Sequence, residues 1–167
     1  MLKPHLGQIL TAYLKLMTEI ESEDLVNALE EIVNLYSDDI GPFALQLTEQ
    51  LMNSYHRLVQ TSPDDDDGEC ALAAQGCVVT IRRIIDSVSK NQELLGKIEE
   101  LALPMLMFCL TPDGMDSIDD ALDCITMMLY HGGKVTPRMW KVYSHLLYLI
   151  CGDEKDPDGG YGFEYIS

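Results

Sequence analysis

Aromatic residues are scarce in this 167-residue sequence, which contains only three Phe and one Trp. Leu, Met and Ile are plentiful by comparison, and this balance favours helix packing over the aromatic and β-branched cores of β-sandwiches. No segment alternates apolar and polar residues with the period of two that a half-buried strand requires. The sequence therefore predicts an all-α fold, and its 47% apolar content is enough for one domain with a sizeable core.

Long hydrophobic runs are also missing. The longest apolar run is far shorter than the roughly 20 residues that a membrane-spanning helix needs. The first residues, Met1, Leu2, Lys3 and Pro4, do not have the pattern of a signal peptide. We therefore expect a soluble chain with no targeting segment of its own and no contact with membranes.

The five cysteines, at positions 70, 77, 109, 124 and 151, form no CxxC pair and no CxxC-plus-His spacing. Four of them fall inside apolar helical stretches, where free Cys packs as a small hydrophobic residue. A zinc site is therefore not expected. This cysteine usage favours a reducing cytosolic or nuclear compartment over secretion.

Motifs for catalysis and cofactor binding are absent from the sequence. It contains no Walker A motif, no GxGxxG and no HExxH. Its four His residues are scattered, and no Ser or Cys motif pairs one of them with a nucleophile. The acidic run at residues 64–67 lacks the ligand spacing of an EF-hand. We predict a protein that is not an enzyme and requires no metal or cofactor.

Basic residues are few: 11 Lys and Arg stand against 28 Asp and Glu, giving a net charge of −17. Such a field repels nucleic acid and anionic membranes and attracts basic proteins. The alternative is that the acidity only keeps a Leu- and Met-rich protein in solution. The positions of the acids must decide between these two interpretations.

Seven segments show apolar residues spaced three and four positions apart, the pattern of an amphipathic helix. The clearest stripe lies within residues 38–60 and consists of Ile40, Phe43, Leu47, Leu51, Tyr55, Leu58 and Val59. Ser37 and Asp38 can cap this helix, and Pro42 falls in its first turn, where a missing N–H costs no hydrogen bond. The other helices are expected at residues 4–17, 22–36, 69–89, 92–110, 116–130 and 136–151.

Expected caps and inward residues define the remaining helices more closely. Ser22 and Thr136 are candidate N-caps, and Gly132-Gly133 is expected to end the sixth helix in the left-handed conformation. In the fourth helix Leu72 and Ile81 are expected to face the core, as is Trp140 in the seventh.

The helices alternate in character along the chain. The first, third, fifth and seventh contain a proline near the start or inside, while the others contain small residues that permit close approach, Gly76 among them. Helix pairs recurring about every 40–50 residues indicate a HEAT or armadillo superhelix. We expect about three and a half antiparallel pairs within residues 1–152: residues 4–36, 38–89 and 92–131, then a helix at 136–151. Residues 153–167 are read as a loop and the start of a truncated next helix.

Two other helical folds compete with this assignment. Tetratricopeptide repeats require a period of about 34 residues and their own Trp-Leu-Gly-Tyr pattern, which the sequence lacks. An up-down helix bundle remains the alternative.

Three segments resemble the middle-to-late part of the importin-β (karyopherin-β) family of nuclear transport receptors, nearest to the importin-7 and importin-8 type. The first is YLKLM at residues 13–17 with DLVNALEEIV at 24–33, and the second is IGPFALQL at 40–47. The third runs from DSVS at 86–89 through LP at 103–104 and LTPDG at 110–114 to MW at 139–140. Together these segments touch most of residues 4–150.

The resemblance implies a HEAT superhelix that binds basic cargo on its concave side, such as a ribosomal protein or a histone. It also implies binding of the small GTPase Ran in its GTP form, contact with phenylalanine-glycine nucleoporins, and shuttling between cytoplasm and nucleus. The amino-terminal repeats that form the family's main Ran contact have no counterpart here, so Ran-GTP is expected to bind only through the full-length receptor. Candidate residues for the phenylalanine-glycine slots are Met52 and Met107, although periodicity favours the core for both.

Two groups of acids are candidate partner-binding residues. The first is an acidic loop between two helices of one pair: Asp64, Asp65, Asp66, Asp67 and Glu69. Its negative charge can attract Lys- and Arg-rich cargo, or it is only a solvated, disordered loop. The second lies on the second helices of the pairs, which line the concave face in the family: Asp24, Glu31, Asp116, Asp120 and Asp123. Any helix that faces water shows such a polar stripe, so exposure alone also explains them.

The resemblance thus implies part of a nuclear transport receptor that carries basic cargo under Ran-GTP control. The alternative is a non-catalytic HEAT scaffold of a multi-protein assembly.

Overall fold

The computed structural model describes residues 3–20, 22–61 and 69–151. Over these residues the secondary structure is entirely helical, with no strand, and the prediction of an all-α fold is confirmed. The α-helices are α1 (Leu6–Glu19), α2 (Glu23–Leu35), α3 (Ala44–Thr61), α4 (Glu69–Ser87), α5 (Gln92–Cys109), α6 (Ile118–Gly132) and α7 (Pro137–Cys151). Short 3-10 helices accompany them: η1 (Lys3–His5), η2 (Ser37–Asp39), η3 (Gly41–Phe43) and η5 (Pro112–Ser117).

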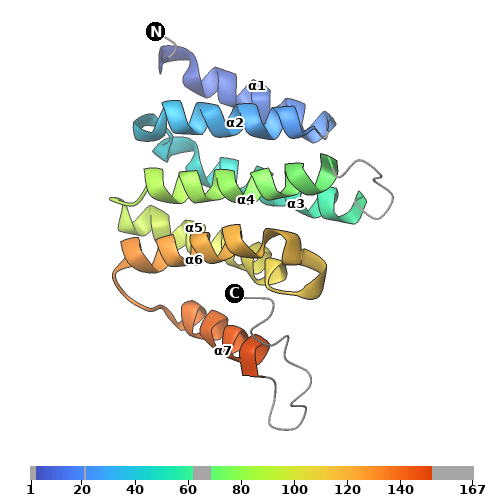
Figure 1. Cartoon of the computed structure of the whole chain (residues 1–167). Coiled ribbons are helices and arrows are strands. Elements are labelled where there is room, and N and C mark those ends of the chain that lie inside the picture. The colour runs from blue at the N-terminus through green and yellow to red at the C-terminus, as the bar shows by residue number, and fades with distance from the viewer. Residues whose placement is uncertain (1–2, 21, 62–68, 152–167) are drawn as a thin grey trace. The chain divides into compact units, whose positions relative to one another are not determined.

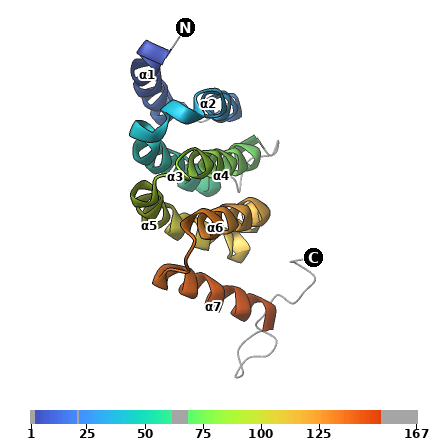
Figure 2. The same cartoon turned by 90° about the vertical axis from the view of Figure 1, so that its left-hand side faces the viewer.

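The chain divides into two compact units, Met1–Gly132 and Gly133–Ser167. In the first unit six α-helices form two layers. Figure 2 shows α1, α3 and α5 in one column and α2, α4 and α6 in the other, and Figure 1 shows α2, α4 and α6 stacked in front. Successive helices alternate between the layers, so the unit is a stack of helix pairs, as in HEAT repeats.

The core of the first unit lies between its two layers. Leu47 and Leu51 of α3, Ile81 and Ile85 of α4, and Ile98 of α5 are completely buried. The most extensive contacts join α3 with α4 and α2 with α4. Helix α4 is therefore the centre of the unit, packed against its own partner and against the preceding helix of its layer.

A glycine lets α2 and α4 approach closely. A Cβ atom added at Gly76 would lie 2.9 Å from Cγ1 of Val26, so a side chain there would force Val26 of α2 to shift. The prediction that Leu72, near the start of α4, faces the core is wrong, because this side chain is 53% exposed. Counting back three and four residues from buried Cys77 gives Ala74 and Ala73, which are buried instead.

Helix α3 begins at Ala44 rather than near residue 38, because η2 and η3 precede it. Pro42 has no N–H to donate to the Asp38 carbonyl, so an α-helical ladder cannot run through this point. Ser37 and Asp38 consequently do not cap α3. Ser22 occupies the N-cap position of α2, but its side chain forms no capping hydrogen bond.

The predictions for the C-terminal end of α6 and the N-terminal cap of α7 are correct. Gly133 has a φ of 63°, the left-handed conformation expected after α6. The Thr136 hydroxyl accepts a hydrogen bond from the Met139 amide at 3.2 Å and caps α7.

The second unit contains α7. Its buried residues are Met139, Val142 and Leu149, whereas Trp140 is 57% exposed and stacks edge-on against Tyr143 at 5.7 Å between ring centroids. The prediction that Trp140 faces the core is therefore wrong. Both stripes have helical spacing, and periodicity alone does not choose between them. Residues 153–167, read from the sequence as a loop and a further helix, lie outside the described residues.

Candidate binding surfaces

The predicted concave-face acids lie on α2, on α6 and on η5, the short helix that precedes α6. Asp24 and Glu31 belong to α2 and are exposed. Asp120 and Asp123 belong to α6, while Asp116 precedes it in η5. The helix that was expected from about residue 116 begins at Ile118, because residues 112–117 form a 3-10 helix.

Helix α4 provides partners for the acids of α6. The Gln75 amide donates a hydrogen bond from Nε2 to Oδ2 of Asp120 at 2.8 Å. Arg82 forms an ion pair with Asp123, with Nη1 3.3 Å from Oδ2. Both pairs are at least partly exposed, so each contributes little to stability. These two contacts matter more for binding than for stability, because each occupies a carboxylate that was predicted from the sequence to bind a partner.

Two further polar contacts connect α4 with its neighbours in the layer. Arg83 Nε lies 3.4 Å from Glu30 Oε1 on α2, and His131 Nε2 of α6 lies 3.5 Å from Asp86 Oδ1. Within the described residues, Asp24, Glu31 and Asp116 have no ion-pair partner. These three acids are the part of the predicted concave-face set whose charge no described cation neutralises.

The predicted acidic loop cannot be compared with the structure. Asp64, Asp65, Asp66 and Asp67 lie outside the described residues, and Glu69 is described only as the first residue of α4. The loop therefore stays a prediction from the sequence.

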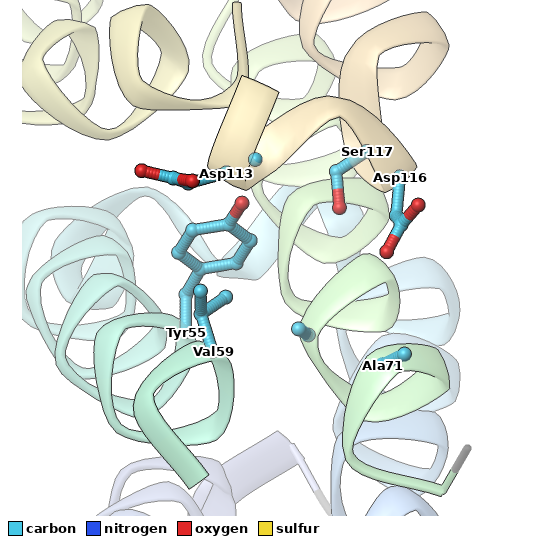
Figure 3. Close-up of a pocket in the computed structure, with 8 residues that line it drawn as sticks. Tyr55, Val59, Ala71, Asp113, Asp116 and Ser117 are labelled. Carbon is cyan, nitrogen blue, oxygen red and sulfur yellow. The ribbon is translucent and has the colours of Figure 1, made fainter. Parts of the chain in front are cut away.

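A cavity of about 390 Å³ lies where α3, α4 and η5 meet (Figure 3). Tyr55 and Val59 enter it from α3, Ala71 and Ala74 from α4, and Asp113, Gly114, Asp116 and Ser117 from η5. Neither Tyr55 nor Asp113 was predicted from the sequence as a site residue, although Tyr55 was correctly placed in the apolar stripe of its helix. The acids in and after the turn, Asp113 and Asp116, were the available signal.

Tyr55 forms the floor of this cavity. It is only 1% exposed, and the Cys109 thiol donates a hydrogen bond to its hydroxyl oxygen at 3.2 Å. Burial is the main cause that raises the pKa of Tyr55 far above its ordinary value. The hydroxyl therefore remains neutral at physiological pH and does not add to the negative charge of the cavity.

A second, more apolar depression lies between α3 and α5 in the other layer. This groove of about 700 Å³ is lined by Leu45, Gln46, Glu49, Met52, Lys97, Glu100, Leu101 and Pro104. Four of these residues are apolar, and Leu45, Met52 and Leu101 are each half-buried. Met52 thus lines a surface groove, whereas Met107, although also half-buried, is not among the lining residues.

Cys70 is a half-buried thiol, and Cys77, Cys109 and Cys124 are buried thiols. Burial raises the pKa of Cys77 to about 12 and also raises the pKa values of Cys109 and Cys124. Within the described residues, no three His, Cys, Asp or Glu side chains are grouped so that they could hold a metal ion. None of the described helices is long and apolar enough to cross a membrane.

Comparison with known proteins found relatives that carry importin names. The chain is 35% identical over 144 residues to an importin beta-like SAD2 homolog of Arabidopsis thaliana. It is 29% identical over 149 residues to a probable importin-7 homolog of Dictyostelium discoideum, and 21% identical over 141 residues to human importin-8. These alignments cover 84–89% of this chain but only 13–14% of each relative. No family model and no solved structure matches the chain.

Proposed function

Because the chain belongs to the importin-β family, we propose that it forms a HEAT-repeat segment of a receptor that carries basic protein cargo through the nuclear pore under Ran-GTP control. The observation that carries the proposal is the 35% identity to an importin beta-like relative over 85% of the chain. The segment acts through shape and charge. It shuttles with its receptor between cytoplasm and nucleus, and Ran-GTP acts through the full-length receptor.

The charge distribution supports a basic cargo. The net charge of −17 produces a field that accelerates the approach of Lys- and Arg-rich proteins. Among the residues that the structure describes, Asp24, Glu31 and Asp116 have no ion-pair partner. We assign the first contact with cargo to these acids and to the loop at residues 64–67. Asp120 and Asp123 become available only when cargo competes with Gln75 and Arg82.

The groove between α3 and α5 supports contact with phenylalanine-glycine repeats. It lies between neighbouring helices of the layer opposite to the acidic one, and Leu45, Met52, Leu101 and Pro104 provide apolar surface for a phenyl ring. A separate surface allows cargo and nucleoporin to bind at the same time.

The proposal is tested with the longer receptor that contains this segment, immobilised and incubated with a histone or a Lys-rich ribosomal protein. We expect the basic protein to be retained, and to be released when Ran-GTP is added. Retention that is indifferent to Ran-GTP contradicts the receptor proposal and favours a HEAT scaffold.

The same experiment includes a variant in which Asp64, Asp65, Asp66 and Asp67 are changed to Ser. We expect a lower association rate at about 0.01 M ionic strength, where the Debye length is about 30 Å, and a much smaller effect at 0.15 M, where it is about 8 Å. The control neutralises four exposed acids elsewhere: Glu19, Asp38, Glu93 and Asp119. An equal loss in both variants means that the loop acts only through total charge.

Changing Met52 to Glu is expected to weaken binding of a Gly-Leu-Phe-Gly peptide to the chain by about tenfold, or about 1.4 kcal/mol. A carboxylate in the groove removes apolar surface and must be desolvated when a phenyl ring binds. Met107→Glu is the matched control, since this methionine is also half-buried but does not line the groove. Titration followed by peptide fluorescence anisotropy measures both, and equal affinities for the two variants argue against the groove.

A further inference from the structure

The cavity between α3, α4 and η5 is small for a ligand pocket. Its volume of about 390 Å³ is near the lower end of the roughly 300–1,000 Å³ typical of ligand pockets. Tyr55 closes the floor and is held by Cys109, while Val59, Ala71 and Ala74 provide small apolar walls. Figure 3 shows Asp113 and Asp116 attached to the η5 turn on the opposite side from Val59 and Ala71. The cavity therefore combines an apolar wall with an acidic rim.

The charges on this rim are uncompensated. None of the eight lining residues is basic, and within the described part of the chain neither Asp113 nor Asp116 has an ion-pair partner. The acids that follow them in α6 differ, since Asp120 accepts a hydrogen bond from Gln75 and Asp123 pairs with Arg82. Of the acids beside the cavity, Asp123 is thus neutralised by Arg82, and Asp120 keeps its charge but is hydrogen-bonded by the neutral Gln75 amide.

These features match the chemistry of a long basic side chain. Lys and Arg carry an aliphatic stem that packs on apolar surface and a charged end that seeks carboxylates. An acidic or neutral ligand gains nothing from the rim, and two carboxylates without a third ligand are a poor site for a metal ion. A large apolar ligand would have to desolvate both carboxylates without compensation.

We propose that this cavity binds one Lys or Arg side chain of a partner protein, with the stem against Val59 and Ala74 and the charged end at the rim that carries Asp113 and Asp116. The inference rests on the proposed function, in which the partner is basic cargo, and it names the place where one cargo residue is held. Asp24 and Glu31 then act at a distance, whereas the cavity makes a stoichiometric contact.

The test uses the 167-residue chain, labelled with ¹⁵N, and small probes rather than cargo. N-acetyl-arginine methylamide and N-acetyl-lysine methylamide are titrated, with the norleucine and glutamate analogues as controls for stem and charge. We expect saturable shifts of the amide signals of Ala71, Ala74, Gly114 and Ser117 with the basic probes only. Saturation by the norleucine analogue would identify an apolar pocket and overturn the proposal.

Three variants separate a shaped site from general acidity. D113N/D116N is expected to weaken binding of the arginine probe by about fivefold, in line with two exposed charge contacts. Ala71→Leu keeps both carboxylates but fills the cavity, and it is also expected to abolish the localised shifts. E19Q/D38N removes the same charge from distant exposed positions and should bind like the unmodified chain.

Unchanged binding to Ala71→Leu would mean that the carboxylates act as diffuse charges and that no side chain enters the cavity. Circular dichroism of each variant checks that the helices are retained. The probe experiment involves neither Ran nor the pore, so its failure leaves the receptor proposal standing. Conversely, a receptor that ignores Ran-GTP leaves probe binding unaffected.

Discussion

Replacing Ile81 with Ala is expected to lower the free energy of unfolding by about 2–5 kcal/mol. Ile81 is completely buried at the middle of α4, the helix that contacts α2, α3 and α6. Removing its side chain leaves a cavity between layers that are fixed by many other contacts, so the surrounding side chains can fill it only partly.

The matched control is Leu72→Ala on the same helix. Leu72 is 53% exposed, and its truncation is expected to change the stability by no more than about 0.5 kcal/mol. Urea unfolding followed by circular dichroism measures both variants. Comparable losses for Ile81 and Leu72 would contradict the register of α4 and return Leu72 to the core.

Replacing Gly114 with Ala is expected to destabilise the chain by about 3 kcal/mol, at the upper end of the cost of overpacking. The added Cβ would lie 2.5 Å from the carbonyl oxygen of Phe108 and 2.8 Å from the Cα atom of Cys109. Both are backbone atoms at the end of α5, so relief requires η5 to move away from the helix. The Gly114 amide donates a hydrogen bond to the Thr111 carbonyl at 3.0 Å, which such a movement would strain.

Gly96→Ala provides a control of opposite sign. Gly96 lies exposed inside α5 with nothing within 4 Å of an added Cβ. Alanine there should raise the stability by about 0.5–1 kcal/mol, because it restricts the unfolded chain and favours the helix. The two substitutions add the same methyl group, and equal effects of one sign would refute the close approach of η5 to α5.

The acidic layer illustrates how far net charge predicts a binding surface. The sequence assigned five acids to the concave face, and the structure divides them by their neighbours. Gln75 and Arg82 project from α4 toward Asp120 and Asp123, while Asp24, Glu31 and Asp116 have no ion-pair partner among the described residues. Arg82 is a cation and pairs with Asp123, whereas the neutral Gln75 amide only hydrogen-bonds Asp120, so acids of equal charge in one helix layer differ in how far their neighbours satisfy them.

The sequence by itself determined the helical class, the alternation of helix pairs and the family. Three-and-four spacing depends only on local geometry, so the stripe from Leu47 through Leu51 to Tyr55 could be identified without a structure. The caps at Gly133 and Thr136 were equally predictable, since each depends on a residue's own backbone and its near neighbours.

Only the tertiary structure decided which of two possible stripes is buried, and which acids are unpaired. Leu72 and Trp140 have the right spacing for the core yet face outward, because helical spacing alone does not say which of two adjacent stripes is buried. The cavity of Tyr55, Asp113 and Asp116 brings together residues about 60 positions apart in the sequence. No local pattern contains this arrangement, since it arises from packing η5 against the ends of α3 and α4.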